Sequence, residues 1–255
     1  AAHAQASDKP LWELGAGAGA LVLPHYRGAD QSHVWLLPVP YVVYRGELFK
    51  ADRNGARATL FDGERSELNL SLAASAPTRS DDNRARSGMA DLDPTVELGP
   101  VWSYTLLRGE AHRVEVRLPL RAAFTVQSSP RHIGWVSNPQ INLYHRWADW
   151  NIGLQTGPLF ADRRFHAYYY DVTEADAVAG RPAYRSRGGY GGWQATAALS
   201  RNFGNYWLGA YVKADQIAGQ AMGDSPLVRD RQNLSAGVAF AWIFARSSTR
   251  VPAPE

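Results

Sequence analysis

The chain contains no cysteine, no long hydrophobic run and only three lysines among its 27 basic residues. The absence of cysteine excludes thiol catalysis, zinc–cysteine sites and disulfide bonds. No stretch reaches 18 apolar residues, which excludes a transmembrane helix. The 27 basic and 24 acidic residues nearly balance, whereas a nucleic-acid-binding protein would show a basic stripe. Arginine therefore supplies most of the positive charge, and it can pair with carboxylate or phosphate.

The N-terminus resembles the end of a processed export signal. Ala4-Gln5-Ala6 has the small-x-small form of a signal-peptidase site. We expect residues 1–10 to be a flexible segment that contains the signal-peptide remnant, 11–246 to form one domain and 247–255 to be a C-terminal tail. An ordinary flexible terminus is the alternative for the first residues.

Alternation of apolar and polar residues is the dominant pattern in the chain. From Val114 to Val126 every second residue is apolar, whereas the opposite face includes Arg113, Glu115, Arg117 and Arg121. Similar alternation occurs around 68–72, 150–155, 193–200 and 233–244. A period of two predicts strands with one apolar and one polar face, and a helical period fits none of these segments. The nine tryptophans and twelve tyrosines suit the aromatic belts of a membrane protein.

We predict a transmembrane antiparallel up-and-down β-barrel of about twelve strands, with short periplasmic turns and long extracellular loops. The predicted strands span 11–24, 32–45, 47–52, 56–61, 66–76, 94–106, 110–126, 131–145, 148–160, 190–200, 205–217 and 232–245. The polar stretches 76–92, 161–189 and 216–231 are the long loops. A soluble β-sandwich or a lipocalin-like barrel would also alternate, but runs of 11–17 residues match a membrane crossing better. Ten or fourteen strands remain alternatives.

Charged residues on the polar face are predicted to point into the barrel. These candidate pore-lining residues are Arg113, Glu115, Arg117, Arg121, Lys213 and Asp215, with Glu97 beside them. They can line a conducting passage, or they can neutralise one another in a closed interior, and the sequence leaves both possibilities open.

Other candidate sites are weaker. Gly15 to Ala20 matches a dinucleotide fingerprint, but the residues that follow predict a strand where that motif needs a helix. The seven histidines lack metal-site spacing. Asp81, Asp82, Asp91 and Asp93 crowd one loop, where either a divalent ion or nearby arginines can balance them. We predict no metal site and no cofactor.

A barrel hydrolase needs a serine–histidine pair near one rim. Ser128, Ser129 and His132 are the nearest candidates, but no carboxylate stands beside them and no G-x-S-x-G motif occurs. A polar hairpin loop is the preferred interpretation. We therefore expect that the protein is not an enzyme and has no catalytic residues.

Several segments together resemble the MltA-interacting protein / outer-membrane protein V (MipA/OmpV) family. They include Leu14–Gly17, Leu23–Asp30 and Leu37–Tyr41, and later Glu97–Pro100, Gly157–Asp162 and Asp224–Val228. Ala29 and Asp171 depart from the family's usual Ser and Gly. The resemblance covers about residues 11–246.

The resemblance implies a location in the outer membrane of a Gram-negative bacterium, among lipid and lipopolysaccharide. It also implies a scaffold that brings a lytic transglycosylase together with a penicillin-binding protein, and it transfers no catalytic residues. The alternatives are a small-solute channel or a surface adhesin. A scaffold would act through the periplasmic turns and the N-terminal segment, although those turns are short.

Overall fold

The computed structural model describes residues 8–46, 49–52 and 55–252. A 3-10 helix, η1 (Ser80–Asp82), and one α-helix, α1 (Arg163–Tyr170), occur in loops. No described helix has both the length and the apolar character of a membrane span. The strands are β1 (Lys9–Pro10), β2 (Trp12–Pro24), β3 (Ser32–Arg45), β4 (Phe49–Asp52), β5 (Gly55–Asp62), β6 (Ser66–Ser75), β7 (Thr95–Arg108), β8 (His112–Pro119), β9 (Arg121–Thr125), β10 (His132–Ser137), β11 (Gln140–Trp147), β12 (Trp150–Ala161), β13 (Gly189–Phe203), β14 (Tyr206–Gln216), β15 (Gln232–Arg246) and β16 (Arg250–Val251).

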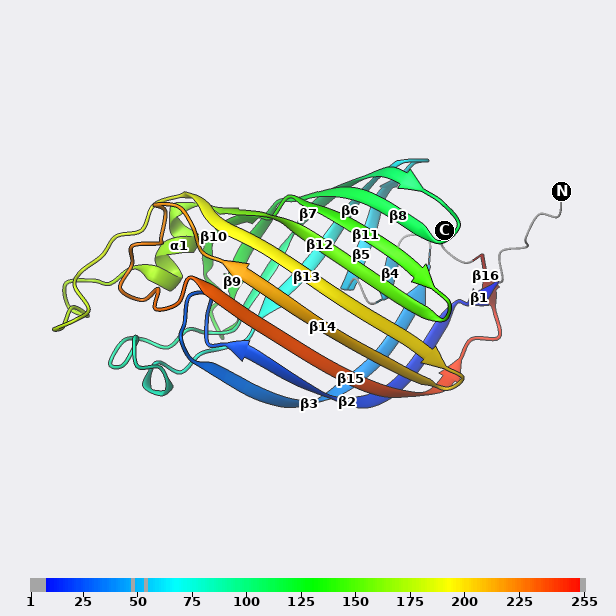
Figure 1. Ribbon diagram of the computed structural model, residues 1–255, viewed down its shortest axis with the longest axis horizontal. Coiled ribbons are helices and arrows are strands. Elements are labelled where there is room, and N and C mark those ends of the chain that lie inside the picture. Colours follow the sequence, from blue (N-terminus) through cyan, green and yellow to red (C-terminus); the bar gives the residue numbers. More distant parts are fainter. Residues whose placement is uncertain (1–7, 47–48, 53–54, 253–255) are drawn as a thin grey trace.

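Fourteen of these strands form one antiparallel sheet that closes on itself (Figure 1). Closure comes from β2, which pairs with β3 on one side and with β15 on the other. β8 and β9 lie end to end along β7, and β10 and β11 lie end to end along β12. Within the described ranges the wall therefore has twelve positions, which confirms the predicted barrel.

Two predicted strands are each interrupted once. The predicted strand 110–126 breaks at Leu120, after Pro119, and the predicted strand 131–145 breaks at Asn138 and Pro139. Proline has no backbone N–H to donate to a neighbouring strand, so a sheet tolerates it where a strand ends or is interrupted. The interruptions leave the order of the wall unchanged, because both halves keep the same neighbours.

The predicted two-faced wall is confirmed on β15. Val238, Phe240 and Trp242 are exposed, whereas the alternate residues Asn233 and Ser235 are buried. An exposed apolar row around a closed barrel is suited to contact with lipid chains. The inner face of β2 carries glycines, and at Gly17 a Cβ atom would lie 1.9 Å from the Phe240 carbonyl oxygen. Glycine is therefore required at this close approach of β2 to β15.

The two ends of the barrel differ. Short turns join β5 to β6, β7 to β8, β11 to β12 and β13 to β14, and the described strands β1 and β16 lie near this end (Figure 1). Segments 25–31, 76–94, 162–188 and 217–231 leave the opposite end. Short turns mark the periplasmic end of such a barrel, so the four long segments are extracellular.

The four extracellular segments pack together into one structure, called here the outer cap. Its buried core combines Tyr26, Leu92, Tyr170 and Met222 with neighbours from the same four segments. The hydroxyl of Tyr26 donates to the Leu227 carbonyl oxygen at 2.7 Å. The cap thus buries apolar side chains among themselves, as the core of a small globular domain does.

Helix α1 is a difference from the sequence analysis, which predicted a loop throughout 161–189. Asp162 caps the helix by accepting a hydrogen bond from the Phe165 backbone N–H at 2.8 Å. The helix packs on β10, where Gly134 has a φ of +129° and a Cβ atom would lie 2.2 Å from the Asp162 carboxylate. Glycine at 134 allows the helix to approach the wall at this point.

The two ends of the described chain meet outside the barrel. Lys9 pairs with Val251 and Pro10 with Arg250, so β1 and β16 form a two-stranded sheet, called here the terminal clasp. Arg45 ties this sheet to the barrel, because its Nη1 donates to the Pro10 carbonyl oxygen at 2.7 Å and its Nη2 contacts Glu13 at 2.6 Å. Residues 1–6, which carry the predicted export signal, lie outside the described residues.

Candidate functional site

A row of polar side chains crosses the inner face of β7, β8, β11, β12, β13, β14 and β15. Successive strand partners in the row are Thr105–Glu115, Glu115–Asn142, Asn142–Gln155, Gln155–Thr196, Thr196–Lys213 and Lys213–Ser235. Directly opposite residues in antiparallel strands hold their side chains close together. The register therefore builds a polar belt inside the barrel from residues that are far apart in the chain.

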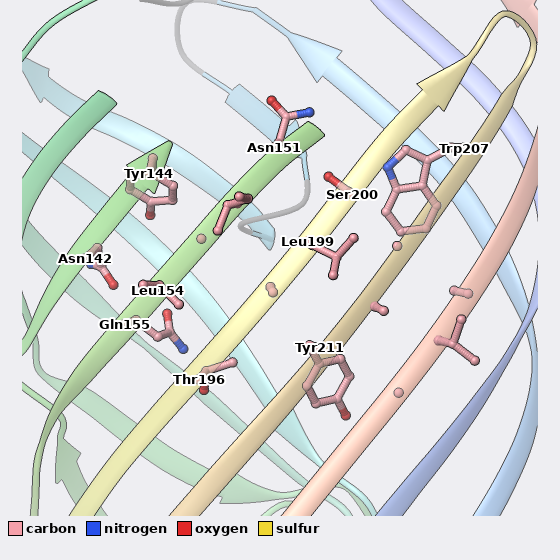
Figure 2. A pocket seen from close by; sticks show the side chains of 18 of the residues that line it. Asn142, Tyr144, Asn151, Leu154, Gln155, Thr196, Leu199, Ser200, Trp207 and Tyr211 are labelled. Atoms are coloured by element: carbon pink, nitrogen blue, oxygen red, sulfur yellow. The ribbon is translucent and has the colours of Figure 1, made fainter. Parts of the chain in front are cut away.

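Two cavities lie within this interior and meet at Arg117 and Gln155, which line both of them. The outer cavity has a volume of about 570 Å³ and extends up to the outer cap, where Tyr26, His166 and Tyr170 line it. The second cavity, of about 460 Å³, lies between β11 and β15 (Figure 2). Its lining combines amide side chains with Tyr144, Trp207 and Tyr211. Each volume lies in the range of small-molecule pockets.

The predicted pore-lining residues lie on the inner face, and most of them are paired. Three ion pairs involve them: Arg113–Glu115 at 3.5 Å, Arg121–Glu97 at 3.9 Å and Lys213–Asp215 at 3.2 Å. Arg113 also stacks its guanidinium over the Tyr144 ring, 4.9 Å from the centroid. Most of the interior charge is therefore neutralised locally.

Asp215 is the most heavily engaged carboxylate of the interior. Its side chain is 3% exposed, and its Oδ1 accepts from Arg27 Nε at 2.7 Å and from Gln194 Nε2 at 2.5 Å. Its Oδ2 lies 3.2 Å from Lys213 Nζ. Because Arg27 belongs to the outer cap and Asp215 to β14, this cluster joins the cap to the wall.

Arg117 differs from its charged neighbours. Its Nε is buried without a hydrogen-bond partner, and it forms no ion pair within residues 8–46, 49–52 and 55–252. Across the strands it faces Ser103 on β7 and Gln140 on β11, neither of which carries a compensating charge. A positive group thus stands unpaired where the two cavities meet.

Three residues of this site were not predicted from the sequence. Arg27 and His166 come from segments read as loops, and Asn142 lies on a predicted strand but was not singled out. Alternation gives a usable signal for Asn142 alone, because Leu143 and Ile141 on either side of it are apolar. Nothing local in the sequence indicates that Arg27 reaches Asp215, which is 188 residues away.

His166 borders the outer cavity from the cap. Its Nδ1 lies 2.7 Å from the Arg187 carbonyl oxygen, so this nitrogen carries the proton and Nε2 has a free lone pair. Nε2 is buried without a hydrogen-bond partner among the described residues. Burial lowers the pKa of His166, which keeps the ring neutral, and burial likewise raises the pKa of Tyr26 to about 12.

Comparison with protein families decides what kind of barrel this is. The family model described as "MltA-interacting protein MipA" matches residues 16–244, which is nearly the whole chain. The chain belongs to the MipA family. With the lipid-suited wall described above, membership identifies it as an outer-membrane barrel and confirms the resemblance found in the sequence.

This MipA family barrel is similar, at low sequence identity, to several solved structures. The CymD monoaromatic hydrocarbon channel is 11% identical, with a TM-score of 0.41 over 93% of this chain and 90% of that one. Outer-membrane phospholipase A from Escherichia coli is 11% identical, with a TM-score of 0.35 over 91% and 93%. A Pseudomonas aeruginosa FadL homologue is 6% identical, with a TM-score of 0.40 over 93% and 91%. The search of curated proteins finds no match.

In this MipA family member the remaining candidate residues do not assemble into sites. No hydrogen bond joins Ser128 or Ser129 to His132 in the described chain, and His132 Nδ1 instead lies 3.2 Å from Arg164 Nη1. In the acidic loop, Asp91 accepts from the Ser80 backbone N–H at 2.7 Å. No cluster of three or more histidines or carboxylates suited to a metal occurs among the described residues.

Proposed function

We propose that this protein is a non-enzymatic outer-membrane attachment point for murein enzymes, acting through its periplasmic end. The observation that carries the proposal is the outer cap, which packs a buried core across the extracellular mouth of the barrel. A solute that enters at this end would have to pass the cap, so the cap favours a structural role over a small-solute channel. The family description, which names interaction with MltA, also supports a role in binding a protein partner.

The terminal clasp is the feature of the periplasmic end best suited to contact a partner. It stands outside the barrel wall (Figure 1), and among the described residues β16 pairs with β1 alone. Further bonds hold it in place: Leu11 N–H donates to the Thr249 carbonyl oxygen at 2.9 Å, and Arg250 Nη1 donates to the Asp8 carbonyl oxygen at 3.0 Å. Open strand edges are known docking points for an added strand.

Site-specific photo-crosslinking tests the proposal. A photoreactive residue is placed at Arg250, which is exposed on the clasp, and in a matched control at Val178, which is exposed on the outer cap. After irradiation of intact cells, we expect a murein hydrolase or synthase in adducts from position 250 and none in adducts from position 178. Adducts are identified by mass spectrometry of the purified, tagged barrel.

Two results would contradict the proposal. If position 250 yields no murein enzyme while the barrel is folded and abundant in the outer membrane, the clasp is not the contact. If solubilised wild-type protein also captures no murein enzyme, the attachment role itself is wrong.

A further inference from the structure

The cavities inside the barrel carry an excess of positive charge. Their charged lining residues are four basic side chains and two acidic ones: Arg27, Arg117, Arg121 and Lys213 against Glu97 and Asp215. Both acids are already paired, Glu97 with Arg121 and Asp215 with Arg27 and Lys213. The interior therefore has two positive charges left over: one is shared by Arg27 and Lys213, which both pair with Asp215, and the other is at Arg117.

The position of Arg117 suits a residue that binds one end of a ligand. It borders both cavities, so a group bound to it can extend in either direction. A partly buried guanidinium without a partner is unfavourable, and a carboxylate or phosphate satisfies it with two parallel hydrogen bonds. The charge state of arginine does not change in the accessible pH range, so an anion is the group that relieves this cost.

Asn142 is a second unsatisfied group in the same interior. It is 1% exposed, and neither its amide nitrogen nor its amide oxygen has a hydrogen-bond partner in the part of the chain that the structure describes. Buried side-chain amides are nearly always hydrogen-bonded, so a buried Asn with both ends free calls for an explanation. Its side chain lines the second cavity beside Gln155, its partner across the β11–β12 pair (Figure 2).

The rest of the second cavity combines apolar and aromatic side chains with a few polar ones, among them Asn151, Thr196 and Ser200. Tyr144, Trp207 and Tyr211 contribute rings to its lining (Figure 2), and a cation and an amide therefore lie close to aromatic surface. Binding sites for small organic molecules typically combine an apolar lining with a few well-placed polar groups. A bare inorganic ion would leave this aromatic surface unused.

We propose that the barrel interior binds a small organic anion. Its acidic group, a carboxylate or a phosphate, pairs with Arg117, and its body lies in the second cavity, where Asn142 donates and accepts hydrogen bonds. This binding function is separate from the attachment role at the terminal clasp, because it uses the interior of the wall and none of the clasp residues.

Binding is measured on the full chain refolded into detergent micelles, with the probe present during refolding so that the cap does not limit entry. The probes are benzoate, phenyl phosphate and benzamide, the last being the uncharged counterpart of benzoate. We expect benzoate or phenyl phosphate to raise the unfolding temperature and to change the tryptophan fluorescence, because Trp207 lines the cavity. Benzamide should bind at least about tenfold more weakly than benzoate. The stronger of the two anions identifies the acidic group.

Four variants sharpen the measurement. Arg117→Gln should weaken anion binding by about tenfold or more, whereas Arg117→Lys, which keeps the charge, should restore part of it. Asn142→Ala should weaken binding of 4-hydroxybenzoate, whose hydroxyl can donate to and accept from this amide, and should change benzoate binding little, because the benzoate ring carries no such group. Arg131→Gln is the matched control, because Arg131 lies outside the barrel in the β9–β10 loop with a side chain that is 65% exposed.

The stability of the unliganded protein distinguishes a binding role for Arg117 from a purely structural one. If an anion normally satisfies the guanidinium, Arg117→Gln should leave the unliganded barrel as stable as wild type or more stable, and should abolish the stabilisation by benzoate. The proposal is overturned if neither anion binds wild type, if benzamide binds as well as benzoate, or if Arg117→Gln binds benzoate normally. Failure here would leave the crosslinking result at the clasp unaffected.

Discussion

The outer cap and the barrel wall use apolar residues in opposite ways. Met222 and Leu227 in the cap are completely buried, whereas Leu234 and Val238, only a few residues further along the chain, are 62% and 49% exposed. The cap follows the rule for proteins in water, and the wall follows the rule for proteins in lipid. The change takes place within one short stretch, at the start of β15, so the rim of the barrel separates two solvents.

The cluster around Asp215 joins these two regions, and breaking it should have a large effect on the stability of the cap. Asp215→Asn removes the carboxylate that Arg27 of the cap and Lys213 of the wall share. Removing one partner of a buried ion pair leaves uncompensated charge, and we expect a loss of about 3 kcal/mol, the lower end of the usual range because Lys213 is partly exposed. The measurement is urea unfolding in micelles, combined with limited trypsin digestion of the cap.

Asp149→Asn is the matched control for this prediction. Asp149 also pairs with an arginine, Arg201 at 2.7 Å, but its side chain is 70% exposed at the periplasmic turn. An exposed pair contributes about 0–1 kcal/mol, so this variant should unfold nearly as wild type does. Equal effects of the two substitutions would show that the cap is not anchored through Asp215.

The lipid-facing wall is tested by moving one charge along β15. Val238 lies in the middle of the strand and Leu234 near its extracellular end, and both point outward. Val238→Arg should cost about 2–4 kcal/mol in lipid bilayers, and Leu234→Arg about 0–1 kcal/mol, because the penalty depends on depth. Reversible unfolding from phospholipid vesicles measures both values. Equal costs at the two positions would contradict the assignment of this face to the membrane.

The wall could be predicted from the sequence because its signal is local. The longer strands, such as β13 and β15, alternate over ten or more residues, and the face of one side chain fixes the face of the next. The cap could not be predicted in this way, since Tyr26, Leu92, Tyr170 and Met222 come from four separate segments without any common period. Helix α1 left a weak signal: Asp162 is a good cap and the next eight residues contain neither glycine nor proline.

The sequence allowed us to predict which charged residues lie in the interior, but not which of them form ion pairs. Alternation placed Arg113, Glu115, Arg117 and Arg121 on the inner face, where the structure has them. The sequence could not show that Arg117 alone among them is unpaired, because pairing depends on strand register and on rotamers. The ion pair between Arg27 and Asp215 also required the fold, since it joins a loop to a strand 188 residues later.

The smallest predicted effect concerns acid and the cap. Burial lowers the pKa of His166 from its ordinary value of 6.5, and Arg27 lowers it further, whereas the Arg187 carbonyl oxygen and Asp162 act against the shift. An opened cap exposes the ring and returns the pKa toward 6.5, so the open form binds the proton more readily. Stability of the cap is therefore complete above about pH 6.5 and falls as the pH decreases toward the lowered pKa, by at most about 1.4 kcal/mol per pH unit.

Trypsin digestion of the cap between pH 8 and pH 5, corrected for the pH dependence of trypsin on an unfolded substrate, measures this loss. His166→Gln keeps a polar side chain but cannot gain a proton, so its cap should lose less stability on acidification than the wild-type cap does. Part of the acid effect should persist, because burial also lowers the pKa of His25 in the same cap. Tryptophan fluorescence follows the folding of the wall over the same pH range. An unchanged signal would show that the acid effect is confined to the cap. A wild-type cap that is equally resistant at both pH values would show that His166 does not become exposed when the cap opens.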